Sequence, residues 1–163
     1  MEFRPVFLVI GILLSTLAVM MVVPAAFDLY NGHPDWEVFL VSGGVTLFVG
    51  VGTALTCRTG GGRMMARQAF VMTTLSWMAL VFFASLPLKF SELNLSFTDA
   101  IFEAMSGLTT TGSTVITGLD QAPSGVLIWR ALLQWLGGIG IIVMAIAVLP
   151  MLRGGGMQLF RME

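Results

Sequence analysis

The chain has 163 residues, of which 56% are hydrophobic and only 10% are charged, and its mean hydropathy is +0.92. An ordinary soluble domain carries about 25% charged residues, so this composition excludes that class and favours an integral membrane protein. The formal net charge of -1 provides no basic surface for nucleic acid. A single cysteine and a single histidine exclude an internal disulfide and the usual His/Cys zinc site.

Four uncharged stretches are long enough to cross a bilayer. A spanning helix needs about 20 apolar residues, because each adds about 1.5 Å across a hydrocarbon core of about 30 Å. The four stretches lie at 5–27, 38–57, 68–88 and 131–152, and apolar residues extend the last one back to about residue 124. The first is longer than the apolar region of a signal peptide, so we interpret it as a retained helix. The sequence predicts an all-α integral membrane fold with four transmembrane helices.

Basic residues gather on one side of this predicted topology. Four spans place both termini and the 58–67 loop on the same side, which the positive-inside rule assigns to the cytoplasm. That side holds six of the eight basic residues: Arg4, Arg58, Arg63, Arg67, Arg153 and Arg161. The opposite side holds the acidic residues Asp28, Asp35, Glu37, Glu92, Asp99, Glu103 and Asp120. Two interpretations stay open: an acidic outer vestibule that attracts cations, or acidic residues that are tolerated because they contribute little to topology.

A further uncharged stretch, 104–119, is too short and too polar to cross the bilayer. Ser96 and Asp99 predict a helix start just before it, with serine as the N-cap and an acidic residue in the first turn. Apolar residues then recur at spacings of three and four as far as Leu108. A helix of about 12 residues is about 18 Å long and reaches about halfway through the bilayer. We therefore predict a re-entrant pore helix over 96–109.

The segment that follows this helix is rich in threonine, serine, glycine and valine, and is a poor helix former. Non-helical backbone at membrane depth persists only where it is buried in protein or faces water. Gly112 can adopt backbone angles closed to other residues, so the loop can turn several carbonyl oxygens toward one axis. Such oxygens replace the hydration shell of a monovalent cation, and the negative end of the preceding helix favours the same ion. The residues predict a filter loop over 110–115.

Three stretches carry a resemblance to a known family: FEAMSGLTTTGSTV, IWRALLQWLGGIGIIVMAIAVLPML and GGMQLFRME. They resemble the potassium-transport subunits of the Trk/Ktr/HKT superfamily, most closely its bacterial TrkH/TrkG branch. In that family, four repeats of helix, pore helix with filter loop, and helix surround one potassium pathway. The resemblance implies an N-terminal transmembrane helix pair over 1–67 and a first repeat over 68–163.

The resemblance also implies the site and its surroundings. It assigns potassium binding to Thr110 and Thr111, with Gly112 and Ser113 as further filter positions, and makes potassium the transported, filter-bound ion. It implies the bacterial inner membrane as the location. The implied partners are membrane lipid, the three remaining pore repeats or copies of this chain, a cytoplasmic nucleotide-binding regulatory subunit and a homodimer partner.

One filter loop supplies about a quarter of an ion's coordination shell. We therefore expect part of a longer chain rather than a symmetric tetramer, which the N-terminal helix pair would complicate. The alternative to potassium uptake is a membrane scaffold or accessory subunit with a non-conducting pore loop. We expect no enzyme, because the sequence offers no paired nucleophile and base and no cluster of metal-ligating acidic residues within the membrane.

Three further features have structural interpretations. Arg130, near one end of the fourth span, is expected to form a fixed ion pair with Asp99, Glu103 or Asp120. The glycines of the Gly137–Gly140 stretch are interpreted as a close helix-packing surface rather than a bend. An interfacial aromatic belt is predicted for Trp36, Trp129 and Trp135.

Overall fold

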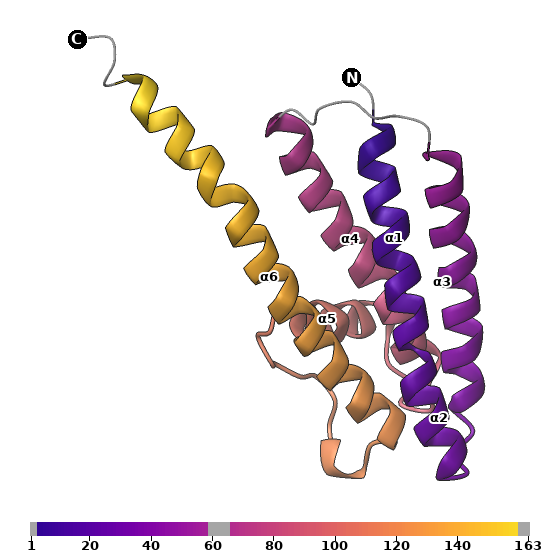
Figure 1. Ribbon diagram of the computed structural model, residues 1–163. Helices are drawn as coiled ribbons and strands as arrows, with labels where there is room; N and C mark the ends of the chain where they lie inside the picture. The colour runs from indigo at the N-terminus through magenta and orange to yellow at the C-terminus, as the bar shows by residue number, and fades with distance from the viewer. Residues whose placement is uncertain (1–2, 59–65, 160–163) are drawn as a thin grey trace.

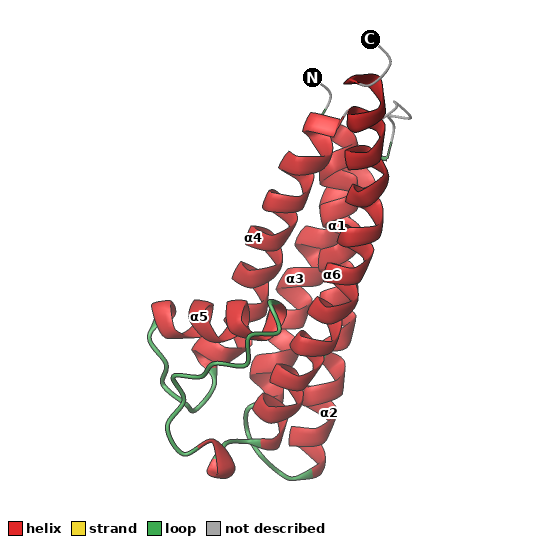
Figure 2. Cartoon of the chain, turned by 90° about the vertical axis from the view of Figure 1, so that its left-hand side faces the viewer, coloured by secondary structure: helices red, strands yellow, loops and turns green. Residues whose placement is uncertain are grey.

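The computed structural model describes residues 3–58 and 66–159, and the regular elements in these ranges are helical. They are α1 (Arg4–Met20), α2 (Val22–Tyr30), α3 (Trp36–Thr56), α4 (Ala66–Phe90), α5 (Phe97–Leu108), a short 3-10 helix (Leu119–Gln121) and α6 (Ser124–Leu159). Helices α1, α3 and α4 run side by side, α6 is inclined to them and leads away toward its C-terminal end, and α5 lies crosswise (Figures 1 and 2).

Four helical stretches in the described ranges are long and apolar enough to cross a membrane. They are Arg4–Tyr30, Trp36–Thr56, Phe70–Phe90 and Ser124–Ile142. The predicted fold class, four spans and one short helix, is confirmed. The spans predicted at 68–88 and 124–152 lie within longer helices, since α4 begins at Ala66 and α6 continues to Leu159. Much of the loop predicted between the second and third spans, including Arg63, lies outside the described residues, as does Arg161.

The first span consists of two helices joined at Met21. Pro24 has no backbone N–H to donate to the carbonyl of Met20, four residues earlier, and its ring crowds that carbonyl. The helix therefore ends at Met20 and restarts at Val22. Met21 keeps right-handed helical angles, so α1 and α2 together still form one crossing.

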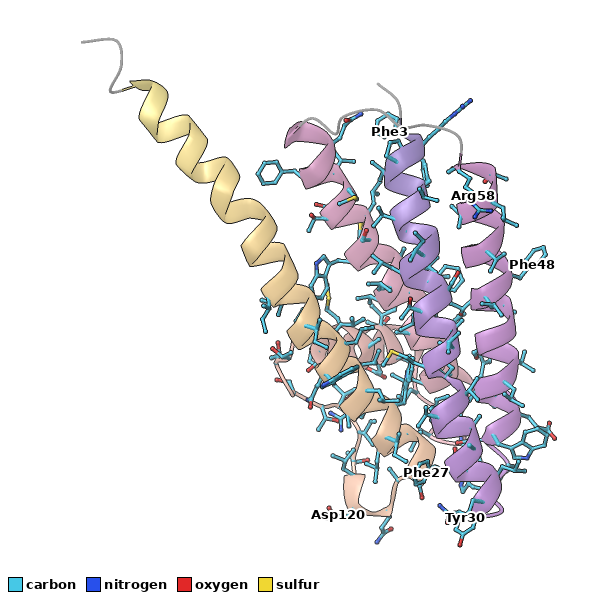
Figure 3. The ribbon with its side chains drawn as sticks, viewed as in Figure 1. Phe3, Phe27, Tyr30, Phe48, Arg58 and Asp120 are labelled. Carbon is cyan, nitrogen blue, oxygen red and sulfur yellow. The ribbon has the colours of Figure 1, made fainter. Side chains whose placement is uncertain are left out.

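The ends of the spans collect at two opposite ends of the bundle. Helix α1 begins, α3 ends, α4 begins and α6 ends at one end (Figure 1). Phe3 and Arg58 mark that end, and Tyr30 and Asp120 mark the other (Figure 3). Apolar side chains such as Phe48, which is 81% exposed, point away from the bundle, as lipid-facing side chains do.

Two of the acidic residues for which an outer vestibule was one interpretation instead hold helices of the bundle together. Asp28 is fully buried, and its Oδ1 accepts a 2.6 Å hydrogen bond from the backbone N–H of Gly125, at the start of α6. Asp35 is 2% exposed and accepts a 3.1 Å hydrogen bond from the N–H of Glu92, after α4. Burial raises the pKa of Asp35, and the hydrogen bond from Glu92 partly opposes that rise. The vestibule interpretation is wrong for both residues.

Trp129 lies in the core rather than at a membrane interface. Its side chain is fully buried, and its indole Nε1 donates a 3.0 Å hydrogen bond to the carbonyl of Ala84 on α4. The ring also meets Phe39 of α3 edge to face, with the ring centroids 6.2 Å apart. The predicted place of Trp129 in an aromatic belt is therefore wrong, because α3 and α4 satisfy both its apolar surface and its single donor.

Candidate cation-binding loop

Helix α5 begins as its sequence predicts. Ser96 has extended backbone angles, and its Oγ accepts a 3.1 Å hydrogen bond from the N–H of Asp99. The same hydroxyl donates a 2.6 Å hydrogen bond to the Asp99 carboxylate. This carboxylate lies in the first turn, where the positive end of the helix dipole attracts its negative charge. The helix covers Phe97–Leu108, one residue shorter at each end than the predicted 96–109.

The loop after α5 turns its backbone N–H groups back toward the helix. Thr110 donates to the carbonyl of Gly107 at 3.0 Å, and Thr111 donates to the carbonyl of Ser106 at 3.0 Å. Gly112 makes a longer hydrogen bond, 3.4 Å, to the same Ser106 carbonyl. The Ser106 hydroxyl then donates to the carbonyl of Ser113 at 2.7 Å. The last turn of α5 is thereby capped by the loop itself.

This capping leaves the loop's own carbonyl groups available. Within the described part of the chain, no hydrogen bond ends on the carbonyl oxygens of residues 109–112. Residues 110–115 are exposed, and the hydroxyls of Thr109 and Thr111 lie 2.8 Å apart beside them. The loop therefore carries several carbonyl oxygens without a hydrogen-bond partner in the described residues, and carbonyl oxygens are the ligands that replace the hydration shell of a monovalent cation.

Two residues of this loop hold left-handed backbone angles. Gly112 has a φ of 76°, which its lack of a Cβ permits. Thr110 has a φ of 58°, a region that β-branched residues rarely adopt and that costs roughly 1–2 kcal/mol. Strained backbone of this kind collects at functional sites, where surrounding contacts hold it. The sequence predicted the special role of Gly112 but gave no signal for the strain at Thr110.

Glu103 of α5 holds the far half of the loop. Its Oε1 accepts 2.6 Å hydrogen bonds from the Thr114 hydroxyl and the Val115 N–H, and a 3.4 Å hydrogen bond from the Ile116 N–H. The side chain is fully buried. The vestibule interpretation is therefore wrong for Glu103 as well. An acidic residue inside a membrane segment was itself the signal that could have singled it out.

Arg130 of α6 completes this arrangement. Its Nε lies 3.0 Å from Oε2 of Glu103, a charge contact rather than an aligned hydrogen bond, and its side chain is only 12% exposed. The predicted fixed ion pair of Arg130 is confirmed, with Glu103 as the partner. The pair joins α5 to α6 directly behind the loop, so the position of 114–116 depends on both helices.

The C-terminal end of α5 packs against glycine on α6. A Cβ added at Gly137 would overlap the carbonyl group of Leu108, the last residue of α5. On the facing side, a Cβ at Gly107 would come within 3.1 Å of the Leu133 Cβ. Helix α6 runs unbroken through Gly137–Gly140, so the alternative of a bend is not observed. The packing interpretation is confirmed for Gly137, whereas a Cβ at Gly140 would meet nothing within 4 Å.

Gly137→Ala is expected to lower the thermal unfolding midpoint, because the added methyl forces α5 and α6 apart. Overpacking of this kind costs about 1–3 kcal/mol. Gly140→Ala is the matched control, since a Cβ there meets nothing within 4 Å. Thermal melts of both variants in one detergent check the prediction. Equal midpoints for Gly137→Ala, Gly140→Ala and the unchanged protein would contradict it.

Comparison with known proteins agrees with this arrangement. The sequence profile of the TrkH family, described as "Cation transport protein", matches residues 37–163. The Trk system potassium uptake protein TrkH of Halomonas elongata is 43% identical, in an alignment covering all of this chain and 34% of that protein. The Escherichia coli protein TrkG is 35% identical over 94% of this chain and 32% of its own length.

The structural comparison reaches the same family. The crystal structure of the potassium transporter TrkH from Vibrio parahaemolyticus matches with a TM-score of 0.86 and 40% identity, over 92% of this chain and 32% of that one. The chain thus spans about a third of the length of these relatives. The family profile describes a transport protein, so the expectation of no enzyme is confirmed. The resemblance found in the pore segment extends over the whole sequence, and the chain belongs to the TrkH family of cation transport proteins.

Proposed function

We propose that this chain supplies one filter loop to a Trk-type potassium uptake pore in a bacterial inner membrane. The observation that carries the proposal is the set of carbonyl oxygens over 109–112, which have no hydrogen-bond partner in the described residues because the loop N–H groups bond back to α5, in a loop whose residues 110–115 are exposed. Thr110 and Thr111 are the proposed potassium ligands, with Gly112 and Ser113 as further filter positions. Relatives named as potassium uptake proteins make potassium the cation of choice.

The exposed face of the loop is the proposed pore side. One loop replaces about a quarter of a hydration shell, so three more loops must face it across an axis. We propose that they belong to a longer chain, in keeping with the third of the relatives' length that these residues span. The ion pair of Glu103 and Arg130 then supports the loop from behind, on the side away from the ion.

Potassium binding should depend on completion of this ring. The 163-residue chain, monomeric in detergent, is expected to show no potassium-dependent rise in its unfolding midpoint, because a ligand stabilises only a state that binds it. The protein in its full natural length should be stabilised by potassium more than by sodium, and Thr110→Ala or Thr111→Ala should reduce that difference. A monomer stabilised selectively by potassium would contradict the proposal that one loop supplies only a quarter of the ion's coordination shell. A complete protein that transports no potassium would favour the scaffold alternative.

The same family resemblance supports two proposed protein partners. One is a cytoplasmic nucleotide-binding regulatory subunit, and the other is a second copy of the complete protein in a homodimer. Copurification of the complete protein from its native membrane, followed by mass measurement of the assembly, tests both partners.

The proposed orientation places both termini and the 58–67 loop in the cytoplasm. Six of the eight basic residues support it. Single cysteines at positions 31, 63 and 92, each in a Cys57→Ser background, test it with an impermeant thiol reagent on intact spheroplasts. Positions 31 and 92 are expected to react and position 63 to stay unlabelled. Labelling of position 63 without position 31 would reverse the orientation.

A further inference from the structure

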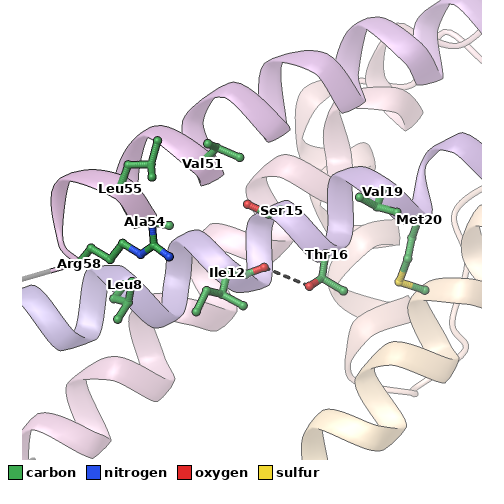
Figure 4. A pocket seen from close by; sticks show the side chains of 10 residues that line it. All are labelled: Leu8, Ile12, Ser15, Thr16, Val19, Met20, Val51, Ala54, Leu55 and Arg58. Carbon is green, nitrogen blue, oxygen red and sulfur yellow. Dashed lines mark hydrogen bonds between the residues drawn. The ribbon is translucent and has the colours of Figure 1, made fainter.

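A groove separates the outward faces of α1 and α3. Its volume is about 640 Å³, and it is lined mainly by apolar side chains such as Leu8, Ile12 and Val19 from α1 and Leu55 from α3 (Figure 4). Arg58 lies at one end, just past the C-terminus of α3. None of its lining residues belongs to the candidate cation-binding loop, so the groove calls for a separate explanation.

The polar side chains of the groove are already satisfied. The Ser15 hydroxyl donates a 2.7 Å hydrogen bond to the carbonyl of Gly11, and the Thr16 hydroxyl donates a 3.1 Å hydrogen bond to the carbonyl of Ile12. The second bond is drawn in Figure 4. Both bonds lie within α1, so neither hydroxyl needs a polar ligand. The walls of the groove therefore suit hydrocarbon.

The groove is held open by a tight contact beneath it. A Cβ at Gly11 would lie 2.6 Å from the carbonyl oxygen of Gly50, and a Cβ at Gly50 would lie 2.8 Å from the N atom of Ser15. Backbones in such close approach fix the spacing of α1 and α3. The site is therefore preformed, and binding of a ligand does not carry the entropic cost of ordering α1 and α3.

Arg58 gives the groove a charged end. The side chain is exposed, and within the described part of the chain it has no ion pair. In Figure 4 its guanidinium lies over the groove, beside Ala54 and Leu8. A positive side chain at the end of an apolar groove complements a molecule with an anionic head and a hydrocarbon tail.

The length of the groove matches one leaflet of a bilayer. Its lining on α1 extends from Leu8 to Met20, which is about 18 Å at 1.5 Å per residue. One leaflet contributes about half of a hydrocarbon core of about 30 Å. We propose that the groove binds an anionic phospholipid, with its phosphate at Arg58 and one acyl chain between α1 and α3. The site does not depend on the function proposed for the filter loop.

Native mass spectrometry of the full-length protein tests this site with two lipids of identical acyl chains, phosphatidylglycerol and phosphatidylcholine. We expect tighter retention of phosphatidylglycerol. Arg58→Gln should reduce that preference about fivefold, the effect of one juxtamembrane arginine. Ile12→Trp, which fills the groove, should reduce retention of both lipids. Phe48→Trp is the matched control on an exposed position of α3 that does not line the groove, and it should change neither.

A photo-reactive amino acid in place of Ile12 identifies the occupant in the membrane. A lipid adduct that is lost with Arg58→Gln is the expected result. A cross-link to another part of the chain or to a second protein would overturn the proposal, because protein would then cover the groove. Equal retention of the two lipids by the unchanged protein would also overturn it.

Discussion

Gly112→Ala is expected to reduce potassium uptake by about tenfold or more while leaving the amount of protein in the membrane unchanged. The cause is backbone conformation rather than crowding. The φ of Gly112 is 76°, whereas the nearest atom to an added Cβ would be the Gln134 Nε2 at an ordinary 3.5 Å. Left-handed angles cost a residue with a Cβ roughly 1–2 kcal/mol, and 1.4 kcal/mol is a tenfold change in population. The loop would then leave the conformation that exposes its carbonyl oxygens.

Gly118→Ala is the matched control for this variant. Gly118 has a φ of 73° and open space around it, but it lies after the proposed filter. It should have a similar effect on the thermal midpoint and little effect on uptake. Gly112→Asn should retain more uptake than Gly112→Ala, because asparagine tolerates left-handed angles best among the other residues.

The activity of each variant is measured as potassium uptake by cells that lack other potassium uptake systems. Gly112→Asp should abolish uptake, since its carboxylate would stand beside the proposed ion path and hold a cation there. Unchanged uptake for both Gly112→Ala and Gly112→Asp would show that this loop is not the filter. Equal losses for Gly112→Ala and Gly118→Ala would assign the effect to folding.

The parts of the structure that could be predicted from the sequence are those set by local pattern. The four spans follow from uncharged length, and the start of α5 follows from the spacing of Ser96 and Asp99. Asp28 and Trp129 were misplaced because their partners, Gly125 and Ala84, are distant in the sequence. A carboxylate near the end of a span looks solvated until the helix that covers it is known.

The candidate cation-binding loop was also only partly predictable. Its composition and Gly112 predicted a non-helical segment, which the structure contains, with carbonyl groups of 109–112 that accept no hydrogen bond in the described residues. The left-handed Thr110 could not be predicted, because nothing in a Thr-Thr-Thr run distinguishes one threonine from the next. Glu103 was one of three candidate partners for Arg130, but its role in holding the loop could not be predicted, since its hydrogen bonds to 114–116 form only once the loop folds back over α5.

Removing one member of the Glu103 and Arg130 pair is expected to cost stability and transport together. Loss of one partner leaves the other charge buried and unpaired, which typically costs about 3–5 kcal/mol. Arg130→Gln should therefore lower the thermal midpoint strongly and abolish uptake. A large loss of stability alone would not show that the pair positions the loop, so variants of Glu103 must separate the two effects.

Glu103→Gln and Glu103→Leu make that separation. Glutamine keeps an oxygen that can accept the hydrogen bonds from Thr114 and Val115, whereas leucine removes every acceptor. Both leave Arg130 unpaired and should lower the thermal midpoint, and Glu103→Leu should lower it further because the donors of Thr114 and Val115 also lose their acceptor. If Glu103 holds the loop, Glu103→Gln should retain measurable uptake with a changed ratio of potassium to sodium, and Glu103→Leu should retain none.

Asp120→Asn is the electrostatic control for this series. Asp120 is an exposed acidic residue at the end of the bundle that Tyr30 marks (Figure 3), so it has the same charge as Glu103 but does not contact the loop through the hydrogen bonds that Glu103 makes. Uptake and ion preference should be unchanged in Asp120→Asn, because the proposed role of Glu103 depends on contact and not on long-range attraction. If Asp120→Asn reduced uptake as much as Glu103→Gln did, an acidic vestibule would explain the data better than a supported loop. If Glu103→Gln and Glu103→Leu kept the same ion preference as the unchanged protein, the hydrogen bonds to 114–116 would have no part in selectivity.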